Sequence, residues 1–179
     1  MSHIAIVHFV NYKRGTQSRA AMRGVMLYVM QEKKTTWEQD GIVWLVSPAG
    51  KIVEQKTSTA GYPTIDGCRL LAPSVGTQIA LDSDYETQRQ SLLKLLAALE
   101  EAGKLGEVNA IHLGDLSCIS MDYMDRFTVK LDYDADFAYE LQLLEMSIAS
   151  DKIQDNMTGT FDMRQREDGS IHFRQNVRG

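Results

Sequence analysis

The pattern of apolar and polar positions divides the chain into short extended runs and two longer helical stretches. From residue 41 onward, short apolar runs alternate with turn residues, which is typical of β-strands. Residues 82–103 and 136–148 instead place apolar residues three and four positions apart, which predicts two helices. In the first of these helices the leucines share one face: Leu92, Leu95, Leu96 and Leu99. Because this face is too short for a coiled coil, we expect it to pack into a core.

The predicted strands surround these two helices in the chain. They are residues 42–46, 51–54, 68–71, 108–113, 119–123, 127–131, 159–165 and 170–175. The first two form a hairpin around residues 47–50 and the last two form a hairpin around residues 167–169, because both connections have the composition of turns. This order predicts an α+β fold, in which a mixed β-sheet packs with two main helices and ends in a C-terminal edge hairpin.

Residues 1–39 have a different pattern and a different charge. Residues 4–10 predict a strand, and residues 16–32 have helical spacing. We expect helical structure to continue to about Trp37. This segment carries six Lys or Arg and two acidic residues, which leaves 13 basic and 22 acidic residues for the rest of the chain. The split can reflect surface composition alone, or two segments of different origin. We predict an appended N-terminal strand-helix over residues 1–39 and a domain over residues 40–179.

The composition is that of a soluble globular protein, with 44% hydrophobic and 24% charged residues. No apolar run approaches the roughly 18 residues that a membrane-spanning helix needs, and the N-terminus lacks the pattern of a signal peptide. The chain as written is therefore expected in the cytoplasm. Cys68 and Cys118 have neither CxxC nor metal-ligand spacing; a disulfide is one alternative, and two free thiols are what we expect.

Residue types that can act in catalysis are present, but they are scattered along the chain. The histidines form none of the closely spaced pairs that ligate a metal; they are His3, His8, His112 and His172. The aspartates at 132–136 lack the glycine and glutamate of a calcium-binding loop and come directly before a predicted helix, where aspartates act as caps. We therefore predict no enzyme activity, no cofactor and no metal, and interpret residues 41–179 as a binding module.

Several short segments resemble, in order and spacing, the C-terminal β domain of the FtsQ/DivIB family of bacterial cell-division proteins. They are residues 44–54 (WLVSPAGKIVE), 62–67 (YPTIDG), 110–115 (AIHLGD), 126–130 (RFTVK) and 159–164 (GTFDMR). The resemblance implies a scaffold of the septal division machinery that binds partners of the FtsB/DivIC and FtsL type. It also implies a membrane-associated family whose β domain is extracytoplasmic.

Residues 8–35 are similar to the N-terminal end of relaxases, the DNA-nicking enzymes of mobile elements, which makes the chain look like a fusion. Tyr28 lies where the nucleophile of such an enzyme is expected, although a helix residue packed on its neighbours is the alternative. No HxH-type metal motif accompanies it. This resemblance implies an alternative function, a relaxase remnant that binds or nicks DNA, with DNA attraction through Arg14, Arg19 and Arg23.

The C-terminal strand is the candidate site for partner binding. A sheet that ends in a hairpin at the chain terminus is expected to leave its last strand at an edge, where a partner can add a strand of its own. Alternation places Ile171, Phe173 and Gln175 on one face and His172 and Arg174 on the other. Phe173 is the predicted apolar anchor and Arg174 the charged one. The alternative for Ile171 and Phe173 is that both face the core.

Overall fold

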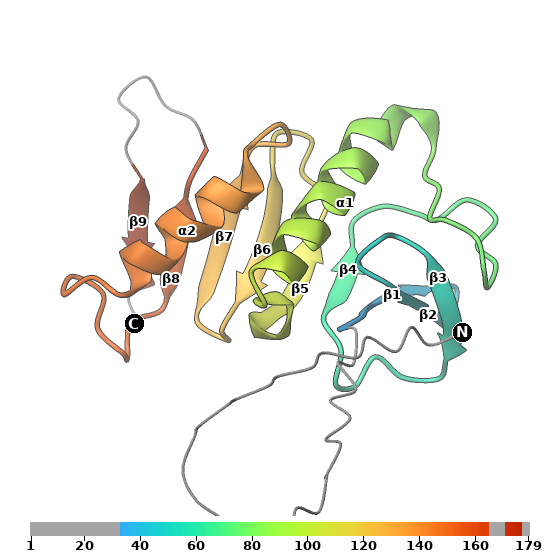
Figure 1. Cartoon of the computed structure of the whole chain (residues 1–179), viewed down its shortest axis with the longest axis horizontal. Helices are drawn as coiled ribbons and strands as arrows, with labels where there is room; N and C mark the ends of the chain where they lie inside the picture. Colours follow the sequence, from blue (N-terminus) through green and yellow to red (C-terminus); the bar gives the residue numbers. More distant parts are fainter. Residues whose placement is uncertain (1–32, 165–170, 177–179) are drawn as a thin grey trace, which may run out of the picture. The chain divides into compact units, whose positions relative to one another are not determined.

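The computed structural model describes residues 33–164 and 171–176, which form one mixed sheet and two main helices (Figure 1). The predicted α+β class is thereby confirmed. The predictions for residues 1–32 lie outside the described residues, and so does the predicted turn at 167–169. These include the strand at 4–10, the helix at 16–32 and the four residues of the relaxase resemblance, Arg14, Arg19, Arg23 and Tyr28.

The sheet has nine strands in the order β3-β2-β1-β4-β5-β6-β7-β8-β9. Their bounds are β1 Thr35–Gln39, β2 Ile42–Val46, β3 Ile52–Lys56, β4 Thr64–Asp66, β5 Val108–His112, β6 Ile119–Tyr123, β7 Phe127–Leu131, β8 Gly159–Asp162 and β9 His172–Gln175. Strand β4 is parallel to both of its neighbours, and β8 is parallel to β7. All other neighbours are antiparallel.

The helical prediction that extended to about Trp37 is wrong at its end, because Thr35, Thr36 and Trp37 belong to β1. All three are buried, as β-branched and aromatic residues inside a sheet commonly are. Asp40 and Gly41 both have positive φ, 54° and 75°, and join β1 to β2 by the tight turn that a twisted hairpin requires.

The strand predicted at residues 68–71 is also wrong; the strand in this region is β4, which ends at Asp66. Side chains of β1 take up the backbone groups of the predicted segment instead. The Trp37 indole donates to the Cys68 carbonyl, and the Gln39 amide both donates to the Leu70 carbonyl and accepts from the Leu70 N–H, at 3.2 and 2.7 Å. Residues held by side chains in this way cannot continue a strand ladder.

Helix α1, Glu86–Glu101, and helix α2, Phe137–Ile148, both lie over the same face of the sheet (Figure 1). The four leucines predicted to form the apolar face of α1 are all completely buried. Helix α2 begins after Asp136, whose carboxylate accepts a hydrogen bond from the Tyr139 N–H at 3.2 Å, as predicted for the acidic residues before this helix.

One row of paired residues runs beneath the helices through eight neighbouring strands. Its members are, in order, Trp44, Trp37, Ile65, Ile111, Met121, Val129, Phe161 and Phe173. All of these except Phe173, at the end of the row, are buried. The core therefore reaches β9 through direct cross-strand contacts.

From β4 to β9 the opposite face of the sheet is polar, whereas at β2 it carries the buried Val43 and Leu45. A second row of paired residues on it consists of Asp66, His112, Ser120, Lys130, Asp162 and His172. None of these side chains is buried. The two faces differ because successive strand residues point to opposite sides, so that from β4 to β9 apolar and polar residues alternate along each strand.

Candidate partner-binding edge

Among the described residues, β9 lies at one end of the sheet and β3 at the other. A strand at a sheet end has N–H and C=O groups that no neighbour satisfies, so each end is a place where another chain could pair. The β3 end is better protected against such pairing than the β9 end, so β9 is the candidate binding edge.

The β3 end is partly covered and partly charged. At its start, Ile52 pairs with the loop before α1, donating to the Thr77 carbonyl at 2.9 Å and accepting from the Gly76 N–H at 2.8 Å. Further along, Lys56 and Glu54 form an ion pair of 3.2 Å. Cover by a loop and charged side chains are two of the common ways in which proteins protect sheet edges.

The backbone of β9 alternates between groups directed at β8 and groups directed outward. The Asn176 N–H donates to the Thr158 carbonyl directly opposite at 2.8 Å, so this pair is of the hydrogen-bonded kind. By alternation, Arg174 and His172 direct their backbone bonds toward β8. The N–H and C=O groups of Phe173 and Gln175 then point away from β8, toward the open edge.

The side chain of Phe173 is part of an aromatic cluster under the end of the sheet. Its ring centroid lies 4.7 Å from that of Phe161 and 6.1 Å from that of Phe127, and the latter two rings are 5.1 Å apart in an edge-to-face arrangement. Phe173 is half-buried and packs against the core, as does Ile171. The core-facing alternative therefore describes the positions of Ile171 and Phe173, whereas His172, Arg174 and Gln175 are exposed.

Gly159 is a residue of this site that the sequence analysis did not select. It pairs with Gln175, and a Cβ atom at this position would overlap the Arg174 carbonyl oxygen and lie 2.7 Å from the Phe173 ring, closer than real side chains approach. Glycine is therefore required for β9 to lie against β8 with the Phe173 ring over residue 159. An isolated glycine at the start of a predicted strand was the available sequence signal, since such glycines often mark a close approach of another chain segment.

Arg126 holds the far side of the aromatic cluster. Its guanidinium lies 4.6 Å from the centroid of the Phe127 ring and donates to the carbonyls of Met157 and Gln154 at 3.1 and 2.8 Å. One side chain thus fixes both the cluster and the segment that leads into β8.

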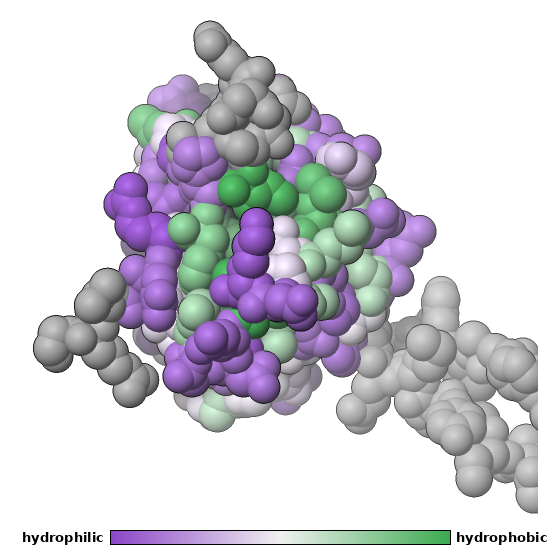
Figure 2. Space-filling view, turned by 90° about the vertical axis from the view of Figure 1, so that its left-hand side faces the viewer, coloured by the Kyte–Doolittle hydropathy of each residue, from purple (hydrophilic) through white to green (hydrophobic). Residues whose placement is uncertain are grey.

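The charges near the edge have mixed signs. Asp162 binds Arg164 through two hydrogen bonds of 2.9 and 2.8 Å, which raise the pKa of the guanidinium further and keep it charged. Arg174 is exposed and forms no ion pair with any residue of the described part of the chain. Figure 2 looks at this end of the molecule and shows apolar surface between hydrophilic residues. The edge therefore offers both an apolar and a cationic contact.

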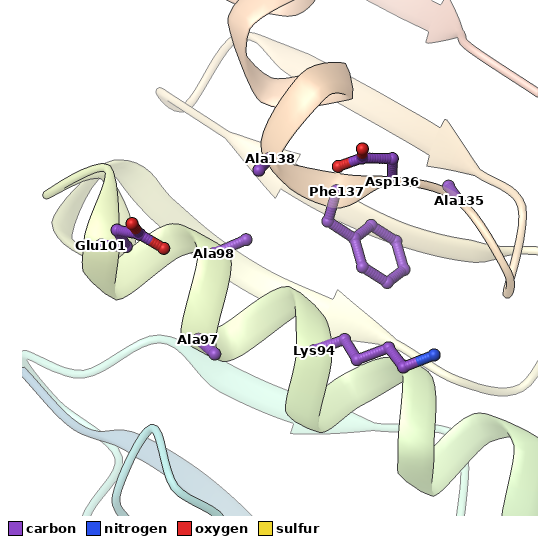
Figure 3. A pocket seen from close by; sticks show the side chains of 8 residues that line it. All are labelled: Lys94, Ala97, Ala98, Glu101, Ala135, Asp136, Phe137 and Ala138. Atoms are coloured by element: carbon purple, nitrogen blue, oxygen red, sulfur yellow. The ribbon is translucent and has the colours of Figure 1, made fainter.

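A groove between α1 and α2 is the other candidate site (Figure 3). It has a volume of about 370 Å³ and is lined by Lys94, Ala97, Ala98, Glu101, Ala135, Asp136, Phe137 and Ala138. Half of these side chains are alanines, which supply no reactive group. The charged ones do not form a nucleophile with a base and an orienting partner, so the groove supports no particular reaction.

The metal-ligating and thiol side chains of the described residues can be placed directly. Over residues 33–164 and 171–176, no three His, Cys, Asp or Glu side chains are grouped so as to hold a metal ion. Cys68 and Cys118 are free thiols, as expected, and burial raises the pKa of both. Raised pKa values make these thiols poor nucleophiles at neutral pH.

The described residues thus form an α+β domain with one protected and one open sheet edge. A family model of the C-terminal domain of the cell division protein FtsQ/DivIB matches residues 35–164. The chain therefore belongs to the FtsQ/DivIB family of cell division proteins. As a family, these are non-catalytic division scaffolds, and their partners are other division proteins.

The chain is also similar to the major extracytoplasmic domain of the trans isomer of the cell division protein DivIB from Geobacillus stearothermophilus. The identity is 14% and the TM-score 0.40, and the match covers 66% of this chain and 92% of that domain. A comparison with curated proteins finds no match. In the described part of the chain, neither helix combines the length and the apolar composition needed to cross a membrane.

Proposed function

We propose that this domain binds partner division proteins of the FtsB/DivIC and FtsL type by strand addition at β9. The outward backbone groups of Phe173 and Gln175, at an edge without the protection seen at β3, are the observation that supports the proposal. A partner strand would form hydrogen bonds with these groups and extend the sheet by one strand.

Side chains of β9 would add selectivity to this backbone pairing. Ile171 and Phe173 would contact the partner through the parts that remain exposed, because their other parts pack against the core. His172, Arg174 and Gln175 would meet the partner directly, and Arg174 is the charged anchor. In this arrangement Phe173 mainly holds the edge in position.

A proline at an outward backbone position tests the mechanism. Gln175→Pro removes an N–H that faces the edge and leaves the pairing of β9 with β8 in place. We expect its affinity for the extracytoplasmic segment of an FtsB/DivIC partner, measured by calorimetry, to fall about tenfold or more. Gln175→Ala is the matched control and should bind like the original chain. Equal binding by the proline variant, with an unchanged circular dichroism spectrum, would reject strand addition at this edge.

DNA binding is the second candidate function, supported by the excess of basic residues before residue 40. A basic segment would attract the phosphate backbone in a salt-dependent manner. A gel shift at low salt tests the attraction, and a nicking assay that compares the original chain with Tyr28→Phe tests the chemistry. A lack of retardation at low salt would eliminate this function.

A further inference from the structure

His112 lies between two carboxylates on the polar face of the sheet. Its Nδ1 atom is 3.0 Å from both carboxylate oxygens of Asp66, and its Nε2 atom is 3.2 Å from an oxygen of Asp122. The three residues come from neighbouring strands, β4, β5 and β6. The second carboxylate is held in turn by Thr128 of β7, whose hydroxyl donates to Asp122 at 2.9 Å.

This geometry requires a particular protonation state. A neutral imidazole carries one N–H, so it can donate to Asp66 or to Asp122 but not to both. Only the imidazolium ion donates from both ring nitrogens. Because both nitrogens face carboxylate oxygens at hydrogen-bonding distance, the arrangement is fully satisfied only when the ring is doubly protonated.

The contact lies at the narrowest part of the sheet. Strand β4 has three residues and, among the strands of the described part, is the only one that connects β1–β3 to β5–β9. It pairs with β1 at two positions and with β5 at three. The bond between His112 and Asp66, the last residue of β4, therefore reinforces the joint between β4 and β5, which has three backbone pairs and lies next to the two-pair joint between β4 and β1.

The other charged groups near His112 are few. Asp66 and Asp122 are the charges that act on its ring, and Lys130 of β7 and Asp162 of β8 lie further along the same row. Helices α1 and α2 lie on the opposite face (Figure 1). Burial lowers the pKa of His112, but the hydrogen bonds with the two carboxylates outweigh it, and the pKa is raised above the ordinary value of 6.5.

We propose that His112 is a pH-sensitive clamp of this joint, which fastens β4 and β6 to β5 in its protonated form and releases one carboxylate when it loses a proton. Since the pKa is higher in the folded chain than in the unfolded chain, the clamp stabilises the fold fully below about pH 6.5. The stabilisation is lost as the pH rises through the pKa of the folded state. The joint therefore loosens toward the alkaline side.

Nuclear magnetic resonance of the full chain tests the clamp directly. The imidazole signals of His112 are identified by their loss in His112→Gln, and their titration gives the pKa and the protonation of each nitrogen. We expect a pKa above 6.5 with both nitrogens protonated below it. Asp122→Asn removes one carboxylate and should move this pKa downward.

Amide exchange at Ile65 reports on the joint itself. Its protection factor should fall as the pH is raised through the pKa of His112, by about tenfold for each unit by which that pKa exceeds its ordinary value. The fall should be absent in His112→Gln and present in His172→Gln, which alters the same row at the edge. A pKa at or below 6.5, or the same pH dependence with and without His112, would overturn the proposal.

Discussion

The ring of Phe173 in the edge strand lies 4.7 Å from the ring of Phe161 in the next strand, in a pair whose backbones do not bond to each other. Side chains approach closely in such pairs because the two strands are nearest there. The same geometry directs the backbone of Phe173 away from β8. Attachment of β9 to the core and its availability to a partner are thus two results of one register.

Two substitutions in β9 separate attachment from binding. Phe173→Ala should lower the free energy of unfolding by about 2 kcal/mol, less than the loss of a fully buried phenylalanine, because the ring is half-buried. Arg174→Ala should change it by less than about 0.5 kcal/mol, since its side chain is exposed. Urea denaturation measures both values.

The same two substitutions should affect partner binding for different reasons. Arg174→Ala should weaken partner binding although the fold is unaffected, whereas Phe173→Ala should weaken it only to the extent that β9 detaches. Equal unfolding free energies for these two variants would contradict the role assigned to the aromatic cluster.

Gly159 provides a test of the close approach between β8 and β9. Gly159→Ala places a methyl group against the Arg174 carbonyl oxygen and the Phe173 ring, and we expect a loss of about 1–3 kcal/mol in unfolding free energy. Thr160→Ala in the same strand is the control, because Thr160 is on the polar face and its loss should cost little. If both variants are equally stable, β9 does not approach Gly159 as closely as described.

A buried tyrosine of β6, Tyr123, contacts carboxylates of the 3₁₀ turn Leu105–Glu107 and of α2, and this contact predicts a response to acid. The Tyr123 hydroxyl lies 2.7 Å from oxygens of both Glu107 and Glu145, and Lys104 forms ion pairs with both. Burial raises the pKa of Glu107, but bonds from Tyr123 and Lys104 outweigh it and lower the pKa below 4.5. Its contribution to stability is therefore present above pH 4.5 and lost as the pH falls through the lowered pKa.

Tyr123→Phe should therefore cost about 1–3 kcal/mol at neutral pH and should reduce the loss of stability in acid. Tyr133→Phe is the matched control, since the Tyr133 hydroxyl donates to the Asp115 carbonyl at 2.6 Å rather than to a carboxylate. Denaturation series at several pH values measure both effects. An unchanged acid response in Tyr123→Phe would show that this hydroxyl does not stabilise the charged form of Glu107.

The parts of the fold that could be predicted from the sequence are those with a local signal, such as a helical repeat of apolar residues or a capping residue. The leucines of α1 and the aspartate before α2 sufficed for both helices, because helix periodicity and capping are local properties. Strand β1 was missed because Lys33 and Lys34, directly before it, continue the basic character of the preceding segment. The Asp40-Gly41 pair, a strong local hairpin signal, was present and marks the correct boundary of the strand.

The candidate site could be predicted only in outline. Alternation correctly separated Phe173 from Arg174, but the direction of each backbone N–H depends on the register with β8, which no local pattern specifies. The clamp at His112 was not predictable, because Asp66 and Asp122 are 46 and 10 positions away in the chain and meet it only through strand order. The domain boundary at 39/40 stays a prediction, although β1 places residues 35–39 in the sheet.

Amide exchange of β9 with and without a division partner is the most direct measurement of the central claim. If a partner strand pairs with this edge, the amides of Phe173 and Gln175 should become strongly protected on binding, while those of His172 and Arg174, already bonded to β8, should change little. Protection that appears elsewhere, with Phe173 and Gln175 still exchanging as in the free chain, would contradict the account.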